Sequence, residues 1–461
     1  MTALVDRLLK SSAANVLSLV ARVSEQLLLV PILLSAWSVE RYGEWILLSA
    51  LPTFLAMSDM GFITAGSNEL ARRASREDNG SVRRFYGWYA ALCNVWGVAL
   101  GGGLCLLAWL LPLNELFGLT VIPASEASIA FLFLAVGSLF SQNSLVLLAG
   151  LRVSGRYHQG LLVRAFFSFA RLFLIAIAVL YAEAGPVGVA AISCGGFLAA
   201  YLMERALVVR LKLRPVWVSL FRESEPIRPY LLMGLEYMLM PLAQMLVLQG
   251  MVIFVGTVLG AVAVAVFTTH RTLTRMVSSL LQIVSNPLTA EVGLLQRPED
   301  LPELQRVLLL VSRITLWTSL LVVTGFFATG EWIFYSWTRN EVAYDSVLFS
   351  ILLLATLSET IWRTLSSVRM GTNRHRPLVW GYLFLTLSGL LMASVLVASF
   401  GLAGVAFATM LVDAGMCALT ILVTLPLINL SARAYLAGLL RPPLAEISFL
   451  LNSISRRRRS K

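Results

Sequence analysis

The sequence has few charged residues and almost no lysine. Charged types make up 13% of the 461 residues, against 58% for the hydrophobic types, whereas a soluble domain carries about a quarter charged residues. This shortage excludes a water-soluble globular protein. Twelve spans of about 25 residues with short connections would use nearly the whole length. We therefore expect an all-α, polytopic membrane protein without an aqueous domain of ordinary size.

Cysteine is also scarce, and no catalytic motif is present. The chain has four cysteines without CxxC or paired spacing, at Cys93, Cys105, Cys194 and Cys417. They indicate neither a disulfide framework nor a metal site. No glycine-rich phosphate loop, HExxH or GxSxG string occurs, and the expected outer connections are short. We therefore expect a protein that is not an enzyme and holds no cofactor.

Apolar stretches separated by charged clusters, glycine and proline predict twelve transmembrane helices in two sets of six. The first six are expected near residues 12–36, 43–66, 85–111, 125–150, 159–183 and 185–210. The second six are expected near residues 230–256, 260–290, 305–330, 345–370, 378–400 and 401–428. The first set predicts an N-terminal lobe over residues 1–216, and the second set predicts a C-terminal lobe over residues 217–430. The two lobes would surround a central cavity, and residues 431–461 would form a basic tail.

The net charge of +11 is distributed unevenly between the expected connections. The even-numbered connections carry arginine clusters, whereas the odd-numbered ones hold only Arg41 and Arg339. By the positive-inside rule, both termini are then cytoplasmic. The run Arg456 to Arg459 in the tail is interpreted as an electrostatic anchor to anionic membrane lipids rather than as a nucleic-acid site.

The two halves resemble each other at a constant offset of 216 residues. A GxxGVA string at Gly185 recurs at Gly401, with further matches in phase upstream. Because six helices preserve orientation, such repeats are parallel, and transporters built in this way bind substrate between their halves. The pattern predicts a transporter that works by rocking one half against the other.

Arg271 and Arg275 lie one turn apart in the expected eighth helix. Like charges at this spacing repel unless something neutralises them, and ionisable groups inside spans usually face a cavity or a partner. One interpretation is an anionic ligand. The other is pairing with carboxylates on neighbouring helices, such as Glu236 or Glu359.

Other ionisable residues leave similar alternatives. Arg22 could contact a phosphate or pair locally with Glu25, and Arg171 lies deep in the fifth helix on the same face as Arg164, which could reach the membrane surface. Glu359 and Arg363 are spaced for a helical ion pair but could also serve a site. Four acids are candidates for coupling transport to Na⁺ or H⁺: Glu25, Asp59, Glu236 and Glu359.

Three segments resemble helices of one known family. Residues Tyr42 to Arg73 resemble the second helix of bacterial polysaccharide flippases of the multidrug/oligosaccharidyl-lipid/polysaccharide exporter superfamily. The strings LLLVPILLSAWSVERYGEW and VFTTHRTLTRMVSSLLQIVSNPLTAEV resemble the first and eighth helices of that family. The resemblance implies an inner-membrane flippase for a polyprenyl-pyrophosphate-linked oligosaccharide, such as the O-antigen repeat unit of lipopolysaccharide or an exopolysaccharide repeat unit.

The resemblance also implies site residues and partners. Arginines on the first and eighth helices of related lipid carriers face the pyrophosphate, which gives Arg22, Arg271 and Arg275 that role here. Arg171 and Arg363 are further candidates because of their place inside the expected spans. Glycosyltransferases and a polysaccharide polymerase of the same pathway would be partners. Two competitors remain: a cation-coupled multidrug antiporter of the same superfamily, and an integral-membrane polymerase, which should show a long outer loop that is not predicted.

Overall fold

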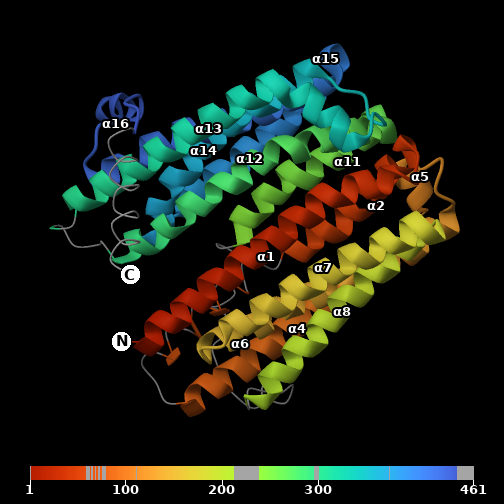
Figure 1. Cartoon of the computed structure of the whole chain (residues 1–461), viewed down its shortest axis with the longest axis horizontal. Coiled ribbons are helices and arrows are strands. Elements are labelled where there is room, and N and C mark those ends of the chain that lie inside the picture. Colours follow the sequence, from red (N-terminus) through yellow and green to blue (C-terminus); the bar gives the residue numbers. More distant parts are fainter. Residues whose placement is uncertain are drawn as a thin grey trace, which may run out of the picture. The chain divides into compact units, whose positions relative to one another are not determined.

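The computed structural model describes residues 2–58, 63, 66–67, 69–70, 73–74, 79–110, 112–211, 238–294, 299, 301–372 and 374–443. In this part of the chain every regular element is a helix (Figure 1). Nine of the helical segments described there are long and apolar enough to cross a membrane. The expectation of an all-α, polytopic membrane protein is confirmed.

The elements follow the expected order. In the first half they are α1 (Thr2–Leu34), α2 (Val39–Ser58), α4 (Asn79–Leu110), α5 (Leu113–Phe117), α6 (Ala124–Val153), α7 (Tyr157–Ala182) and α8 (Pro186–Arg210). In the second half they are the π-helix η1 (Leu246–Gly250), α11 (Met251–Leu259), α12 (Ala261–Leu294), α13 (Leu301–Thr338), α14 (Ser346–Gly371), α15 (Arg376–Thr424), the 3-10 turn η3 (Pro426–Ile428) and α16 (Ala432–Leu439).

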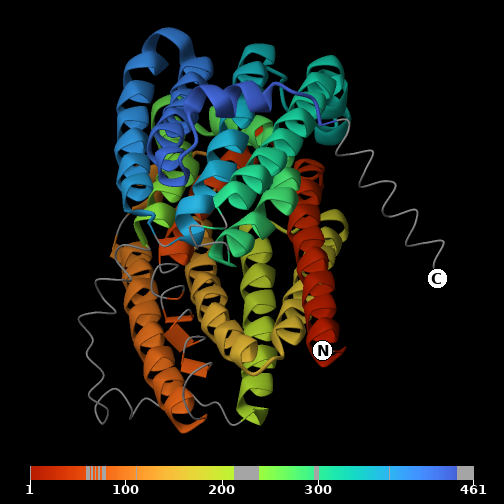
Figure 2. The same cartoon turned by 90° about the vertical axis from the view of Figure 1, so that its left-hand side faces the viewer.

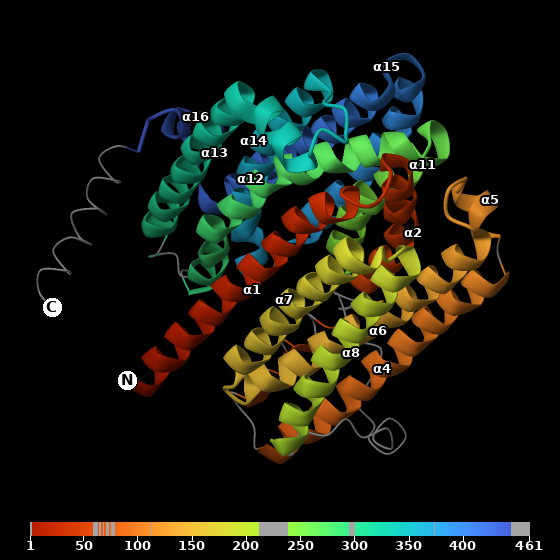
Figure 3. The ribbon, with the colours of Figure 1, turned by 45° about the vertical axis from the view of Figure 1, so that its right-hand side comes forward.

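The chain forms two compact units. Unit 1 comprises Met1–Thr269 and Tyr335–Ala343, and unit 2 comprises His270–Phe334 and Tyr344–Lys461. In unit 1, α6 packs against α4 and α8, and α1 packs along α7 (Figures 1 and 3). In unit 2, α14 packs along α15, and the short α16 lies across the long helices (Figure 2). The expected lobe boundary at 216/217 lies outside the described residues, and that division stays a prediction.

A buried aromatic cluster of unit 1 lies on the face of α4 that meets α6. Phe85, Tyr86, Trp88 and Tyr89 from α4 are all buried there, and the Tyr89 hydroxyl donates to the Ile63 carbonyl over 2.9 Å. Large aromatic side chains bury much area in one place and keep a polar handle that needs a partner. This packing fixes α6, and through it α8.

α15 is an antiparallel hairpin rather than one straight helix. Its only non-helical residue is Gly401, with φ 54° and ψ −134°. On either side of this corner the two halves pack together, with Gly389 against Val412 and Gly415 against Leu385. Small residues let helix backbones approach closely in membrane proteins. The two helices expected at 378–400 and 401–428 are therefore present, joined by a single residue.

The sequence repeat corresponds to a structural repeat. Pro186 starts α8 directly after Gly185, and the second half of α15 starts directly after Gly401. The residue pairs Val189–Ala190 and Val405–Ala406 that follow are completely buried. The helices α6, α7 and α8 thus correspond in order to α14 and the two halves of α15.

Candidate functional site

Five ionisable residues of unit 2 form what we call the arginine cluster: Arg271 and Arg275 on α12, Glu359 and Arg363 on α14, and Asp413 on α15. The first four stand in two i,i+4 pairs, so each pair lies on one face of its helix. All five side chains belong to half-buried residues. Ionisable groups at such positions usually face a polar cavity or a partner.

Glu359 is held by two neighbours. Arg363 Nε donates to Glu359 Oε1 over 2.7 Å, and Ser278 Oγ from α12 donates to Glu359 Oε2 over 2.5 Å. The ion pair that the i,i+4 spacing of Glu359 and Arg363 suggested is therefore formed. It fixes the carboxylate between α12 and α14.

Asp413 is held by an indole instead of a guanidinium. Trp362 Nε1 donates to Asp413 Oδ1 over 2.9 Å, and the Trp362 ring is buried against Tyr382, with 5.3 Å between ring centroids. The Arg363 guanidinium lies 4.8 Å from the centroid of the Trp362 ring. One rigid aromatic side chain thus positions both an acid and an arginine of the cluster.

Arg275 has no hydrogen bond or ion pair with any residue in the described part of the chain. It lies within electrostatic range of Glu359, Arg363 and Asp413, and of Arg271 one turn earlier. Among the described residues, three arginines of the cluster lie near two carboxylates, and Arg271 makes a further interaction of its own. The donors of Arg275 are bonded to no described group, so an anionic ligand could accept hydrogen bonds from them.

The chemistry of the cluster favours a phosphate-type anion. Guanidinium keeps its charge in proteins and presents a planar fork of donors that matches the oxygens of phosphate. The Arg363 fork is already oriented by Glu359, whereas that of Arg275 is not bonded to any described group. Among the described residues, no group of three or more His, Cys, Asp or Glu side chains is placed to hold a metal ion.

Unit 1 contains a second candidate, Arg171, which is tightly paired. Its Nη2 donates to both oxygens of Glu25 over 2.6 Å, and its Nε donates to Glu25 Oε1 over 2.9 Å. Ser168 Oγ donates to Glu25 Oε2 over 2.8 Å, and the ring of Phe197 lies 4.1 Å beneath the guanidinium. These contacts join α1 to α7 and leave Arg171 8% exposed.

Arg22 is an exposed residue on α1 whose Nη1 donates to Ser18 Oγ over 3.0 Å. The local pair with Glu25 that its spacing suggested does not form, because Glu25 faces α7 and bonds Arg171. Among charged groups, Arg164 has the largest electrostatic effect on Arg22. A role for Arg22 in contacting phosphate stays a prediction.

Sequence reasoning missed one acid of unit 1, Glu204. Arg164 Nε donates to Glu204 Oε1 over 3.0 Å, and Ser144 Oγ donates to Glu204 Oε2. Glu204 is completely buried on α8, so Arg164 points inward to it rather than to the membrane surface. A lone acid in an apolar span requires a partner, and this signal was present in the sequence.

The structure gathers Arg271, Arg275, Arg363 and Glu359 in unit 2, and it places Arg22, Glu25 and Arg171 in unit 1. The other two candidate coupling acids, Asp59 and Glu236, lie outside the described residues. The binding and coupling roles of all these residues stay predictions.

Comparisons with known proteins give a fold. No known protein family matches the sequence, and no curated protein matches it. Among solved structures, an inward-facing multidrug resistance MATE family transporter of the MOP superfamily is similar with a TM-score of 0.70 and 17% identity, over 88% of this chain and 94% of that one.

Two further solved structures are similar. The lipid II flippase MurJ in an inward closed conformation has a TM-score of 0.72 and 12% identity, over 93% of this chain and 90% of that one. A MOP superfamily transporter from Pyrococcus furiosus, described as having reverse polarity of its binding pocket, has a TM-score of 0.60 and 17% identity, over 89% and 95%. The chain therefore has the fold of MOP superfamily transporters.

Proposed function

We propose that the chain is a flippase that moves a polyprenyl-pyrophosphate-linked oligosaccharide, an O-antigen or exopolysaccharide repeat unit, across the bacterial cytoplasmic membrane by alternating access. The observation that carries this proposal is the half-buried guanidinium of Arg275, which is bonded to no described residue and lies within electrostatic range of Arg271 and Arg363. Solved structures with this fold include transporters and a flippase, which supports transport rather than catalysis.

A diphosphate fits the cluster better than a cationic drug does. Its oxygens would accept hydrogen bonds from Arg271 and Arg275, and Arg363 lies close enough to act on Arg275 electrostatically. Charge-assisted hydrogen bonds of this kind contribute about 1.5–3 kcal/mol each. The sugars would occupy polar space, and the prenyl tail would stay in lipid.

The proposal includes coupling and partners. Na⁺ or H⁺ movement would drive any uphill step, with Glu25, Asp59, Glu236 or Glu359 as the coupling acid. Of these, Glu25 and Glu359 each hold an arginine, so binding of a cation there would have to compete with an ion pair. Glycosyltransferases of the same pathway would act before the transport step, and a polysaccharide polymerase would act after it.

The test in cells is the double substitution Arg271→Ala with Arg275→Ala. We expect export of the sugar polymer to stop while the amount of folded protein in the membrane stays normal. The matched control is Arg433→Ala with Arg441→Ala, which removes two exposed charges from the same unit. Normal export by the double variant would refute the site.

The test with purified protein compares ligands. We expect polyprenyl diphosphate to bind more tightly than polyprenyl monophosphate, and the double variant to lose about a hundredfold in diphosphate affinity, since two charge-assisted contacts disappear. Equal binding of both lipids by the natural protein would contradict recognition of the diphosphate.

A cation-coupled multidrug antiporter is the second candidate, favoured by the half-buried acids Glu359 and Asp413. Such a protein should bind cationic dyes and confer drug resistance on a sensitised host. Dye binding that depends on Asp413, without any binding of polyprenyl diphosphate, would establish this candidate in place of the flippase.

A further inference from the structure

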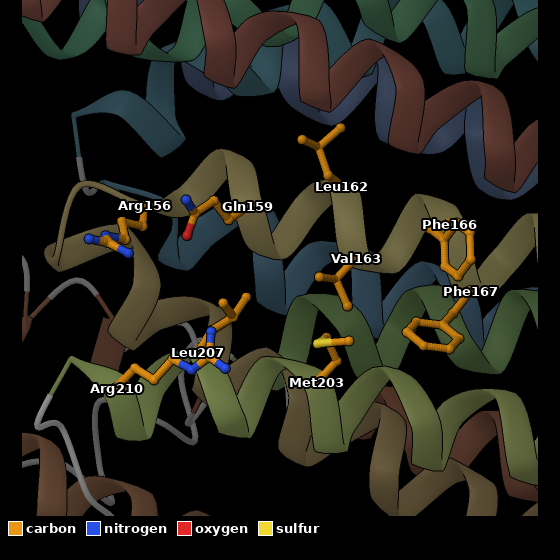
Figure 4. Close-up of a pocket in the computed structure, with 9 residues that line it drawn as sticks. All are labelled: Arg156, Gln159, Leu162, Val163, Phe166, Phe167, Met203, Leu207 and Arg210. Atoms are coloured by element: carbon orange, nitrogen blue, oxygen red, sulfur yellow. The ribbon is translucent and has the colours of Figure 1, made fainter.

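The helices α7 and α8 of unit 1 enclose a groove on their outer face (Figure 4). Its volume is about 520 Å³, and its walls come from these two helices and the residue before α7. Figure 4 shows arginines at one end of the groove and phenylalanines at the other. The groove therefore has a charged end and an apolar length.

Arg156 and Arg210 form the charged end. Arg156 directly precedes α7, and Arg210 is the last residue of α8, so the antiparallel helices bring the two side chains to one end. Both residues are exposed, and neither makes an ion pair with a residue in the described ranges. Gln159 lies beside them (Figure 4), and its Oε1 has no hydrogen-bond partner among described residues. No carboxylate lines the groove.

The side chains of the apolar part of the groove are exposed at the surface of the helices. Leu162 is 44% exposed, Phe166 66% and Met203 48%. From Arg156 to Phe167 the helix rises roughly 16 Å, which is about half of the roughly 30 Å hydrocarbon core of a bilayer. The length of the groove therefore matches the depth of one leaflet.

We propose that this groove binds one anionic glycerophospholipid of the cytoplasmic leaflet. Its phosphate lies between the guanidinium groups of Arg156 and Arg210, and one acyl chain lies along Leu162, Phe166 and Met203. The positive-inside rule assigns both arginines to the cytoplasmic side, where anionic head groups attract basic residues.

Two observations favour this occupant over a long polyprenyl lipid or a zwitterionic one. The groove is one leaflet deep, which suits an acyl chain, whereas a long polyprenyl chain would extend beyond it. Two cationic groups without a lining acid leave a charge that a zwitterionic head group would neutralise only in part. The proposal does not depend on the proposed transport function, because the groove and the arginine cluster lie in different units.

The experiment uses native mass spectrometry of the full-length protein in detergent with added phosphatidylglycerol or phosphatidylcholine. We expect the first bound phosphatidylglycerol to bind about twentyfold more tightly than phosphatidylcholine, since each arginine near anionic lipid contributes roughly a fivefold factor. Arg156→Gln with Arg210→Gln should abolish this preference. The matched control, Arg83→Gln with Arg84→Gln, removes two exposed arginines elsewhere in unit 1 and should retain it.

A second variant tests the apolar part. Val163→Trp puts a large ring into the groove and should weaken phosphatidylglycerol binding while both arginines remain; size-exclusion chromatography checks that each variant is folded. Unchanged binding in both the arginine variant and the tryptophan variant would overturn the proposal. Equal binding of the two phospholipids would also overturn it. The same holds if the natural protein binds polyprenyl phosphate more tightly than phosphatidylglycerol and both variants weaken that binding.

Discussion

In unit 1, Glu25 and Glu204 each hold one arginine in an ion pair, whereas among the described residues of the arginine cluster in unit 2 one of the three arginines is held in this way. Glu25 binds Arg171 and Glu204 binds Arg164, which leaves no excess charge in either pair. In unit 2, Glu359 binds Arg363 while Arg275 bonds no described residue. Paired buried charges join helices, and an unneutralised one is a place for a ligand. The comparison separates arginines whose ion pairs hold helices together from Arg275, which bonds no described residue.

The repeat shows how this difference arises at equivalent positions. At the offset of 216 residues, Phe197 corresponds to Asp413 and Arg171 to Leu387. The ring of Phe197 lies beneath Arg171, while Asp413 accepts a hydrogen bond from Trp362. The helices of the two halves correspond at this offset, but their charged residues do not. Function is therefore expected where the two halves differ.

The largest effect is expected from Glu25→Ala, which leaves Arg171 nearly buried without its partner. Removing one member of a buried ion pair destabilises by about 3 kcal/mol, so unfolding of the purified protein should begin at lower temperature or denaturant. Adding Arg171→Leu, which installs the residue found at the repeat-related position 387, should restore most of the loss. If Glu25→Ala is as stable as the natural protein, the pair in unit 1 is not structural.

An intermediate effect should distinguish two arginines of the cluster. Arg363→Leu leaves Glu359 without its ion-pair partner and should cost about 2 kcal/mol of unfolding free energy. Arg275→Leu removes repulsion and should leave stability within about 1 kcal/mol of the natural value, yet it should weaken binding of polyprenyl diphosphate. Stability measurements and lipid binding on the same samples check this. Equal losses of stability in the two variants would contradict the division of roles.

The smallest effect concerns the glycines that start the repeat-related helices. Gly401→Ala forces an L side chain to a positive φ and should cost about 1.5 kcal/mol. Gly185 has φ −80°, which any residue adopts, and an added Cβ would approach only side-chain ends, those of Arg41 at 3.0 Å and Glu126 at 3.8 Å. Gly185→Ala should therefore change stability by less than about 0.5 kcal/mol. If thermal unfolding shows that Gly185→Ala loses more stability than Gly401→Ala, the backbone angles do not explain which corner requires glycine.

Local patterns could be predicted from the sequence. The expected helix at 185–210 is α8 at Pro186–Arg210, and the one at 125–150 is α6 at Ala124–Val153. These limits follow from apolar length and from proline and glycine, which act locally. The Glu359–Arg363 pair was visible for the same reason, because i,i+4 neighbours always share a helix face.

Contacts between distant segments could not be predicted. Glu25 bonds Arg171, 146 residues away, instead of Arg22 three residues before it. Glu44 is completely buried, and its carboxylate accepts from the backbone N–H groups of Val121 and Ile122 over 2.8 and 2.7 Å. A single sequence shows that such an acid needs donors, but the identity of its donors depends on how the helices pack.

The single-residue corner at Gly401 has a consequence for biosynthesis. From Pro377 to Val412 the chain carries no acidic, lysine or arginine side chain, and the two halves of α15 already contact each other along this stretch. No hydrophilic stretch between them has to be translocated, so both helices can leave the insertion machinery together as a preassembled hairpin.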